Sequence, residues 1–264
     1  MADNPAKPTG LQHIPTSGTL TLGSTRSSII ARGRRDASNA ASNPHYLRAV
    51  ADYNAGNFAD AATSFQLAAE QGHAESQYIL STMFDAGLGL PHDDAQCAHW
   101  ERKAAEQGHA YAQANLSFRY YAAGDFAEAF AWCQRAAYSN LAWAQYNLGL
   151  MHRKGEGAPQ SDIDAAYWYR LAAMQNFPEA QLKLADLYSF GQGVPRNLAQ
   201  AAAWYRKAAD LGNAEAQFQL AHLYATGQGV DPDYTQSRHW IRQAAQQGHE
   251  EAQRELKRRE YRDP

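Results

Sequence analysis

The chain has 264 residues, a formal net charge of −3 and 45% hydrophobic residues. This mildly acidic balance argues against a nucleic-acid groove, which needs clustered Lys and Arg to neutralise phosphates. No run approaches the roughly 18 apolar residues of a membrane-spanning helix. The only two cysteines, Cys97 and Cys133, are interpreted as buried thiols rather than a disulfide framework, which suits a reducing compartment.

Residues 1–42 are rich in Pro, Ser and Thr and contain few large apolar side chains, a composition typical of a disordered tail. The basic stretch 26–35 has three interpretations: a linear motif for a partner, a lid for the chain's own acidic groove, or a solvated tail. The N-terminus lacks the features of a signal peptide. That favours a cytoplasmic protein, with leaderless secretion as the alternative. Helical order is expected to begin near Asn43 and Pro44, because Pro suits the first turn of a helix.

Beyond the tail, two residue types recur in one register. The intervals are 36, 32, 36, 36 and 36 residues for the glutamines and 32, 36, 36 and 36 for the tryptophans. We call the first series the ruler glutamines: Gln77, Gln113, Gln145, Gln181, Gln217 and Gln253. We call the second series the ruler tryptophans: Trp100, Trp132, Trp168, Trp204 and Trp240. A shared register of this period predicts a tandem array, in which each unit contacts mainly its neighbours.

The predicted repeat region is 43–264. Its units are 45–72, 73–108, 109–140, 141–176, 177–212 and 213–248, followed by a capping helix over 249–264. In each full unit, apolar and small residues at spacings of three and four predict a first helix. A Gly-x-Gly turn follows in four of the units, and then a second helix with the Trp and an alanine pair. The third unit lacks the Gly-x-Gly extension, which accounts for its 32 residues.

Helix ends can also be predicted. Gly or Asn follows each second helix, for example Asn140, Asn176 and Gly212, and these two residue types tolerate the left-handed conformation that ends a helix. Acidic residues in the extended turns, such as Asp93 and Asp233, are interpreted as helix N-caps rather than as catalytic carboxylates.

The pattern A-x-A-Q-x-x-L-G/A-x-x-Y-x-x-G-x-G, followed by A-x-x-W-Y-x-x-A-A-x-x-G, resembles the Sel1-like repeat, a relative of the tetratricopeptide repeat. The match is nearly complete over 177–248 and covers roughly residues 45–264. The resemblance implies an all-α fold, a right-handed α/α superhelical solenoid of helix-turn-helix repeats. It also implies a role as an adaptor and does not specify a partner.

Catalytic and cofactor motifs are absent from the sequence. It contains neither Ser-x-x-Lys nor His-Glu-x-x-His. The Gly-x-Gly pairs follow helices and lack the third Gly of a dinucleotide fingerprint. The ten histidines make no recurring i, i+4 pair with another metal ligand. We therefore predict no enzyme activity, no catalytic residues, no metal and no cofactor.

A Leu lies three residues after each recurring Gln and forms a stripe along the first helices. Three positions of the first helix, at −2, +2 and +5 from that Gln, share one face away from the Leu stripe. In a tetratricopeptide-like solenoid this face lines the concave surface, so we predict a partner-binding site there. Its residues are Tyr111, Asn115, Phe118, Trp143, Asn147, Leu150, Lys183, Asp186, Gln219 and His222. Exposed aromatic and amide side chains near residues 111–150 would supply affinity. The alternative is that these aromatics pack against the shortened third turn.

The sequence thus predicts a non-enzymatic scaffold or adaptor that binds a partner protein or peptide in the concave groove, in bacterial signalling or regulation. One alternative is an exported effector or host-factor-binding protein. An alternative from another class is a hydrolase of cell-wall or β-lactam substrates.

Overall fold

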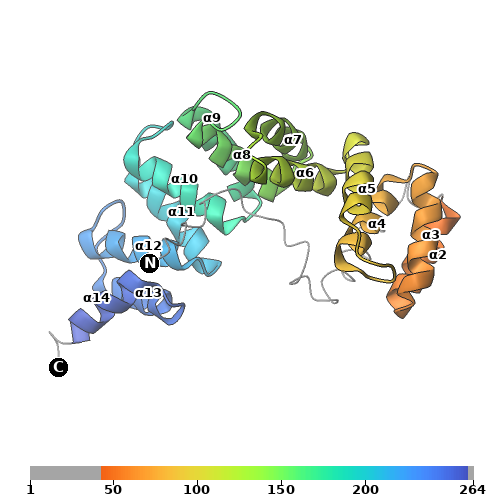
Figure 1. Ribbon diagram of the computed structural model, residues 1–264. Helices are drawn as coiled ribbons and strands as arrows, with labels where there is room; N and C mark the ends of the chain where they lie inside the picture. The colour runs from red at the N-terminus through yellow and green to blue at the C-terminus, as the bar shows by residue number, and fades with distance from the viewer. Residues whose placement is uncertain (1–42, 261–264) are drawn as a thin grey trace, which may run out of the picture. The chain divides into compact units, whose positions relative to one another are not determined.

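The computed structural model describes residues 43–260, and over that range the chain contains α-helices and turns without a strand (Figure 1). The helices are α2 (Pro44–Ala55), α3 (Phe58–Glu70), α4 (Ala74–Ala86), α5 (Asp94–Glu106), α6 (Ala110–Ala122), α7 (Phe126–Tyr138), α8 (Ala142–Lys154), α9 (Asp162–Met174), α10 (Pro178–Phe190), α11 (Leu198–Asp210), α12 (Ala214–Thr226), α13 (Tyr234–Gln246) and α14 (Glu250–Glu260). The predicted all-α solenoid of helix-turn-helix repeats is confirmed. The predicted tail, residues 1–42, lies outside the described residues.

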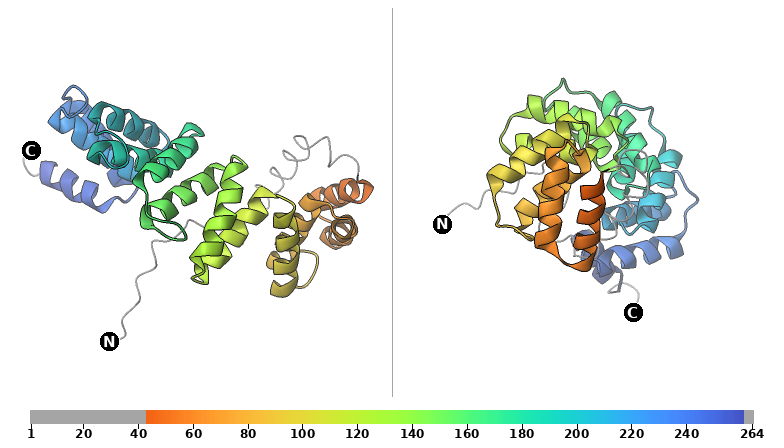
Figure 2. Two further views of the ribbon diagram at one scale, coloured as in Figure 1. Left: turned by 90° about the horizontal axis from the view of Figure 1, so that it is seen from above. Right: turned by 90° about the vertical axis from the view of Figure 1, so that its right-hand side faces the viewer.

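The described chain divides into two compact units, residues 43–139 with α2 to α7 and residues 140–260 with α8 to α14. Within each unit every helix packs mainly on the helices before and after it in the chain, and Figure 2 shows these hairpins from two further directions. We call the even-numbered helices from α4 to α14, which contain the ruler glutamines, first helices. The odd-numbered helices from α3 to α13 are second helices.

The ruler glutamines have a structural role that explains their register. Gln77 Nε2 donates to the Ala69 carbonyl at 3.0 Å, and Gln217 Nε2 donates to the Ala209 carbonyl at 3.1 Å. The same bond joins Gln113 to Ala105, Gln181 to Ala173 and Gln253 to Ala245. Each acceptor is the second alanine of a pair in the last turn of the preceding second helix, where carbonyls lack partners within the helix. The glutamine and alanine registers therefore coincide because one hydrogen bond connects them.

A second glutamine extends this link in some repeats. The residue after a second helix donates to the ruler Oε1, as from Gln107 to Gln77 at 2.6 Å and from Gln247 to Gln217 at 2.8 Å. At the corresponding position the fifth repeat has Leu211, whose side chain has no hydrogen-bond donor. Among the described residues, the buried Gln181 Oε1 has no hydrogen-bond partner. The fifth repeat therefore leaves one buried acceptor unsatisfied, which costs about 1–3 kcal/mol.

The second glycine of the extended turn is required by close packing. At Gly193 the backbone has φ +66°, and an added Cβ would overlap the Asp162 carbonyl group at the start of α9. Gly89 and Gly229 meet the starts of α3 and α11 in the same way. The loop of one repeat thus touches the second helix of the preceding repeat, a reason that the sequence pattern alone did not supply.

The predicted helix ends are confirmed. Asn140 and Asn176 adopt left-handed backbone at φ 59° and 60°. Asp93 accepts hydrogen bonds from two backbone N–H groups at the start of α5, and Asp233 does the same for α13. Helix α2 begins at Pro44, as expected.

Candidate functional site

All ten predicted binding residues lie on first helices: three on α6, three on α8, two on α10 and two on α12. Eight of them are half-buried and so keep part of their surface accessible. The other two, Asn115 and Asn147, are 8% and 0% exposed. The expectation of exposed amides at these two positions was wrong. The side chain of Asn115 instead hydrogen-bonds to the buried carboxylate of Glu101, and buried polar atoms generally need such a partner.

The two aromatic anchors are also partly committed to packing. The Tyr111 ring lies 6.2 Å from the Tyr78 ring and joins the cluster of buried side chains around Trp132. Trp143 is half-buried, and its Nε1 is shielded from solvent. The Tyr111 contacts are with α4 and α7 and not with the shortened third turn, so they do not decide between the two alternatives; they do reduce the apolar surface that Tyr111 can offer a partner.

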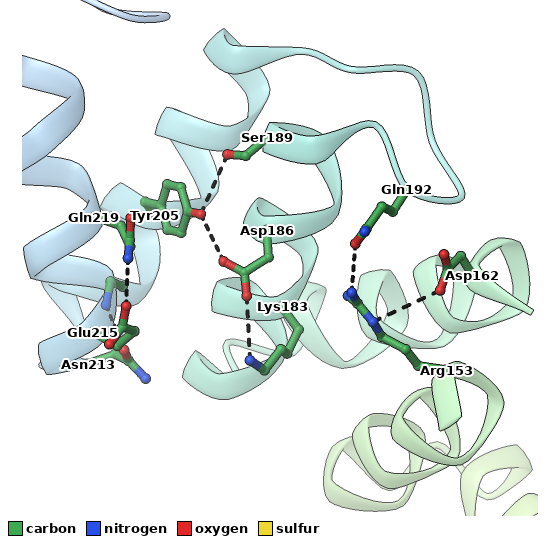
Figure 3. Close-up of polar contacts among 11 residues, drawn as sticks. Arg153, Asp162, Lys183, Asp186, Ser189, Gln192, Tyr205, Asn213, Glu215 and Gln219 are labelled. Carbon is green, nitrogen blue, oxygen red and sulfur yellow. Dashed lines mark hydrogen bonds and ion pairs between the residues drawn. The ribbon is translucent and has the colours of Figure 1, made fainter. Parts of the chain in front are cut away.

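The accessible part of the predicted face in residues 140–260 centres on a polar network between α10 and α11 (Figure 3). Lys183 Nζ lies 3.5 Å from Asp186 Oδ2, and the Tyr205 hydroxyl donates to Asp186 Oδ1 at 2.8 Å. Ser189 Oγ lies 3.5 Å from the same hydroxyl. Burial raises the pKa of Asp186 against the opposing effect of Lys183, and burial also raises the pKa of Tyr205. The network fixes the orientation of four side chains along one edge of the face.

A second polar group lies on α12 (Figure 3). Gln219 Nε2 donates to Glu215 Oε1 at 2.7 Å. His249 Nε2 lies 3.0 Å from Glu215 Oε2. Burial acts to raise the pKa of Glu215, but the hydrogen bonds from Gln219 and His249 outweigh it and the pKa is lowered. His249 also accepts the Ala252 N–H through Nδ1, so this imidazole both caps α14 and ties it to α12. Glu215 is therefore held in place by its neighbours.

Between these groups lies a hollow of about 520 Å³, within the range of about 300–1,000 Å³ typical of ligand sites. The predicted residues Gln219 and His222 line it, together with Tyr205, Phe190 and Arg196. Sequence reasoning missed these last three. The available signal for Tyr205 was its place directly after a ruler Trp, where the second repeat has Glu101 and the third Cys133.

The extended loop that carries Arg196 is anchored to the preceding repeat. Arg153 on α8 donates to Gln192 Oε1 at 2.6 Å and lies 4.0 Å from Asp162 Oδ1 (Figure 3). Together with the contact of Gly193 on α9, these interactions fix the loop from one side. Arg196 Nε then donates to the Ser189 carbonyl at 3.0 Å, so the guanidinium is itself positioned at the rim of the hollow.

The described residues provide little for covalent or metal chemistry. Cys97 and Cys133 are buried, and burial raises the pKa of each thiol to about 12, so neither is a thiolate near neutral pH. No group of three His, Cys, Asp or Glu side chains is placed to hold a metal ion within residues 43–260. In the same range no helix is both long and apolar enough to cross a membrane. What this face offers is fixed polar contacts beside a hollow.

Comparison with known proteins agrees with the repeat architecture. The Sel1 repeat profile matches six segments, residues 65–73, 74–109, 110–141, 144–177, 178–213 and 214–249. The chain belongs to the Sel1 repeat family. A search of curated proteins gives no significant match.

Solved structures support the same assignment. A protective antigen present in uropathogenic Escherichia coli strains, with an SLR fold, is 33% identical with a TM-score of 0.76, over 88% of this chain and 50% of that one. This chain thus spans half the length of that antigen. A Sel1 repeat protein from Oxalobacter formigenes is 30% identical with a TM-score of 0.71, over 80% of this chain and 86% of that chain.

Proposed function

We propose that this Sel1 repeat protein is a non-enzymatic adaptor that binds a peptide segment of a partner protein on the first-helix face of residues 140–260. The observation that carries the proposal is the hollow beside α12, lined by two predicted binding residues and flanked by polar side chains with fixed orientations. Pre-organised side chains lower the ordering cost of binding, which favours recognition without a large change of shape.

The site is distinct from a second accessible surface on the same unit. Helix α9 exposes Ile163, Tyr167 and Met174 at helical spacing, and Tyr167 is 57% exposed. This stripe lies on a second helix. It is apolar, whereas the first-helix face is mainly polar. The two surfaces can therefore be tested against each other with matched substitutions.

The test begins with a displayed random-peptide library selected against the full chain. Affinities of synthetic versions of the selected peptides are measured by fluorescence anisotropy. The double variant Gln219→Ala/His222→Ala should weaken binding at least about tenfold, the loss expected when hydrogen bonds worth about 1.5 kcal/mol are removed from an interface. The matched control is Ile163→Ala/Tyr167→Ala on α9, which should bind as the unaltered chain does.

Circular dichroism of both variants checks that the helices are retained. A library that yields no binder, or binders that lose affinity only in the α9 control, would contradict the proposed site. In the second case the apolar stripe on α9 would be the docking surface.

A further inference from the structure

The rim of the hollow has a cation, Arg196, without a carboxylate partner among the described residues. Arg196 donates through Nε to the Ser189 carbonyl, and within residues 43–260 no Asp or Glu forms an ion pair with it. The residues that line the hollow include no Asp or Glu, and His222 on its α12 side lies 3.4 Å from Glu255. The two carboxylates beside the lining are held by their neighbours, Asp186 by Lys183 and Tyr205 and Glu215 by Gln219 and His249. Arg196 is therefore the lining cation that can pair with an anionic group of a ligand.

The rest of the lining mixes polar side chains with three apolar ones. Leu198 and Leu223 contribute to its walls, and Phe190 at the end of α10 is 71% exposed. At the position of Phe190 the neighbouring repeats have Lys154 and Thr226, so an exposed aromatic here is particular to the fifth repeat. A ligand that fits must present an apolar group close to its negative charge.

A planar guanidinium held at Nε presents its two terminal nitrogens as a fork. This geometry matches the two oxygens of a carboxylate, whereas phosphate sites generally combine several cations. His92 in the second repeat occupies the position of Arg196 and also meets last-turn carbonyls of its first helix, at Phe84 and Asp85. His92 and Arg196 thus share a structural contact with the end of the first helix. Arg196 differs in also presenting two terminal nitrogens that can bind a ligand.

From these contacts we infer that the hollow binds a carboxylate next to an apolar side chain, as at the C-terminus of a partner peptide, with Arg196 as the anchor. This inference rests on the proposed function and adds to it the chemistry of the partner. Gln219 and Gln228 line the same hollow and supply amide groups that can hydrogen-bond the peptide backbone.

The probe is N-acetyl-Leu-Leu with a free carboxylate, titrated into the isotope-labelled full chain and followed by NMR. Millimolar binding should shift the side-chain amide signals of Gln219 and Gln228. The same dipeptide with a C-terminal amide should bind about tenfold more weakly, because it loses a charge-assisted contact. Arg196→Gln should remove this preference, and Arg196→Lys should restore only part of it. Arg242→Gln, on α13 and away from the hollow, is the control.

Each other outcome overturns the inference in a distinguishable way. Equal binding of acid and amide would show a peptide site without a carboxylate anchor and would leave the proposed function standing. Displacement of the acid by an equal concentration of inorganic phosphate would indicate a general anion site. No shift with either dipeptide, while library peptides still bind, would place the partner elsewhere on the face. Failure of both experiments would remove the proposed function as well.

Discussion

The two compact units are built from the same repeat but differ in their balance of acidic and basic residues. Residues 43–139 contain five Lys and Arg against eleven Asp and Glu, a net −6, whereas residues 140–260 contain thirteen of each. The acidity of the chain therefore resides in the first unit. The second unit is neutral overall and contains the hollow, and no carboxylate of residues 43–260 forms an ion pair with Arg196 at its rim.

The same contrast appears inside the repeats, at the position after the ruler Trp. In the second repeat, which belongs to the first unit, this is Glu101, 2% exposed, whose Oε2 lies 2.7 Å from Arg119 Nε. Arg119 also donates to Cys97 Sγ at 3.2 Å. In the fourth and fifth repeats, in the second unit, the position is Tyr169 and Tyr205, and the Tyr205 hydroxyl donates to Asp186. One repeat position thus accepts either a buried ion pair or a phenol, and the two should respond differently to substitution.

The largest effect is expected from an extended-turn glycine of the second unit. Gly193→Ala should cost about 3 kcal/mol or more, because overlap with the Asp162 carbonyl adds to the strain of a positive φ. Gly124→Ala in the first unit has φ +82° but nothing within 4 Å, so it should cost only about 1–2 kcal/mol. Urea unfolding measures both, and equal costs would mean that the loop does not press on α9.

The second largest effect is expected when a substitution breaks the Glu101–Arg119 ion pair of the first unit. Arg119→Met should destabilise by about 3 kcal/mol, the low end for a buried pair that loses one partner, because Arg119 is 42% exposed and water can reach the site. Tyr205→Phe in the second unit should cost about 1 kcal/mol, since one hydrogen bond is lost. Glu101→Leu combined with Arg119→Met should recover most of the loss. A double variant as unstable as Arg119→Met alone would show that packing dominates the site.

The third expected effect is a gain in the stability of the folded chain. Leu211→Gln in the second unit should stabilise the chain by about 1 kcal/mol, because the new amide can donate to the buried Gln181 Oε1. Leu211→Ala is the control, since it removes the exposed leucine without providing a donor. If both variants were equally stable, the Gln181 acceptor would have to be satisfied by water.

The smallest effect depends on pH. His73 in the first unit accepts the Ser76 N–H through Nδ1, and burial lowers its pKa. Burial likewise lowers the pKa of His152 in the second unit. Since the unfolded chain then binds protons more readily, stability should be unaffected well above about pH 6.5 and fall as the pH drops below it. His73→Asn keeps a capping acceptor without a titrating group, so its unfolding curve should change less between pH 7 and pH 5.

The repeat register predicted the helices and their ends well, because it rests on local requirements. Left-handed Asn140 and Asn176, the N-cap at Asp93 and the start at Pro44 each depend on a few neighbouring residues. The face was predicted less well. Helical spacing put Asn115 and Asn147 on the same face as half-buried residues, but it does not reveal that these two side chains are themselves buried. Arg196 was missed because it lies in the extended loop after α10, and only the folded structure shows that this side chain turns back to the last turn of α10.

The bond made by the ruler glutamine gives the array a direction. First helices α4, α6, α10, α12 and α14 each complete the end of the second helix before them, so a hairpin that is last in line has an open carbonyl end. Helix α14 supplies Gln253 to Ala245 and closes the sixth repeat in this way. Shortened versions of the chain should therefore tolerate a cut after a first helix better than a cut after a whole hairpin. An inserted or deleted repeat should preserve folding when its edges fall at equivalent glutamines.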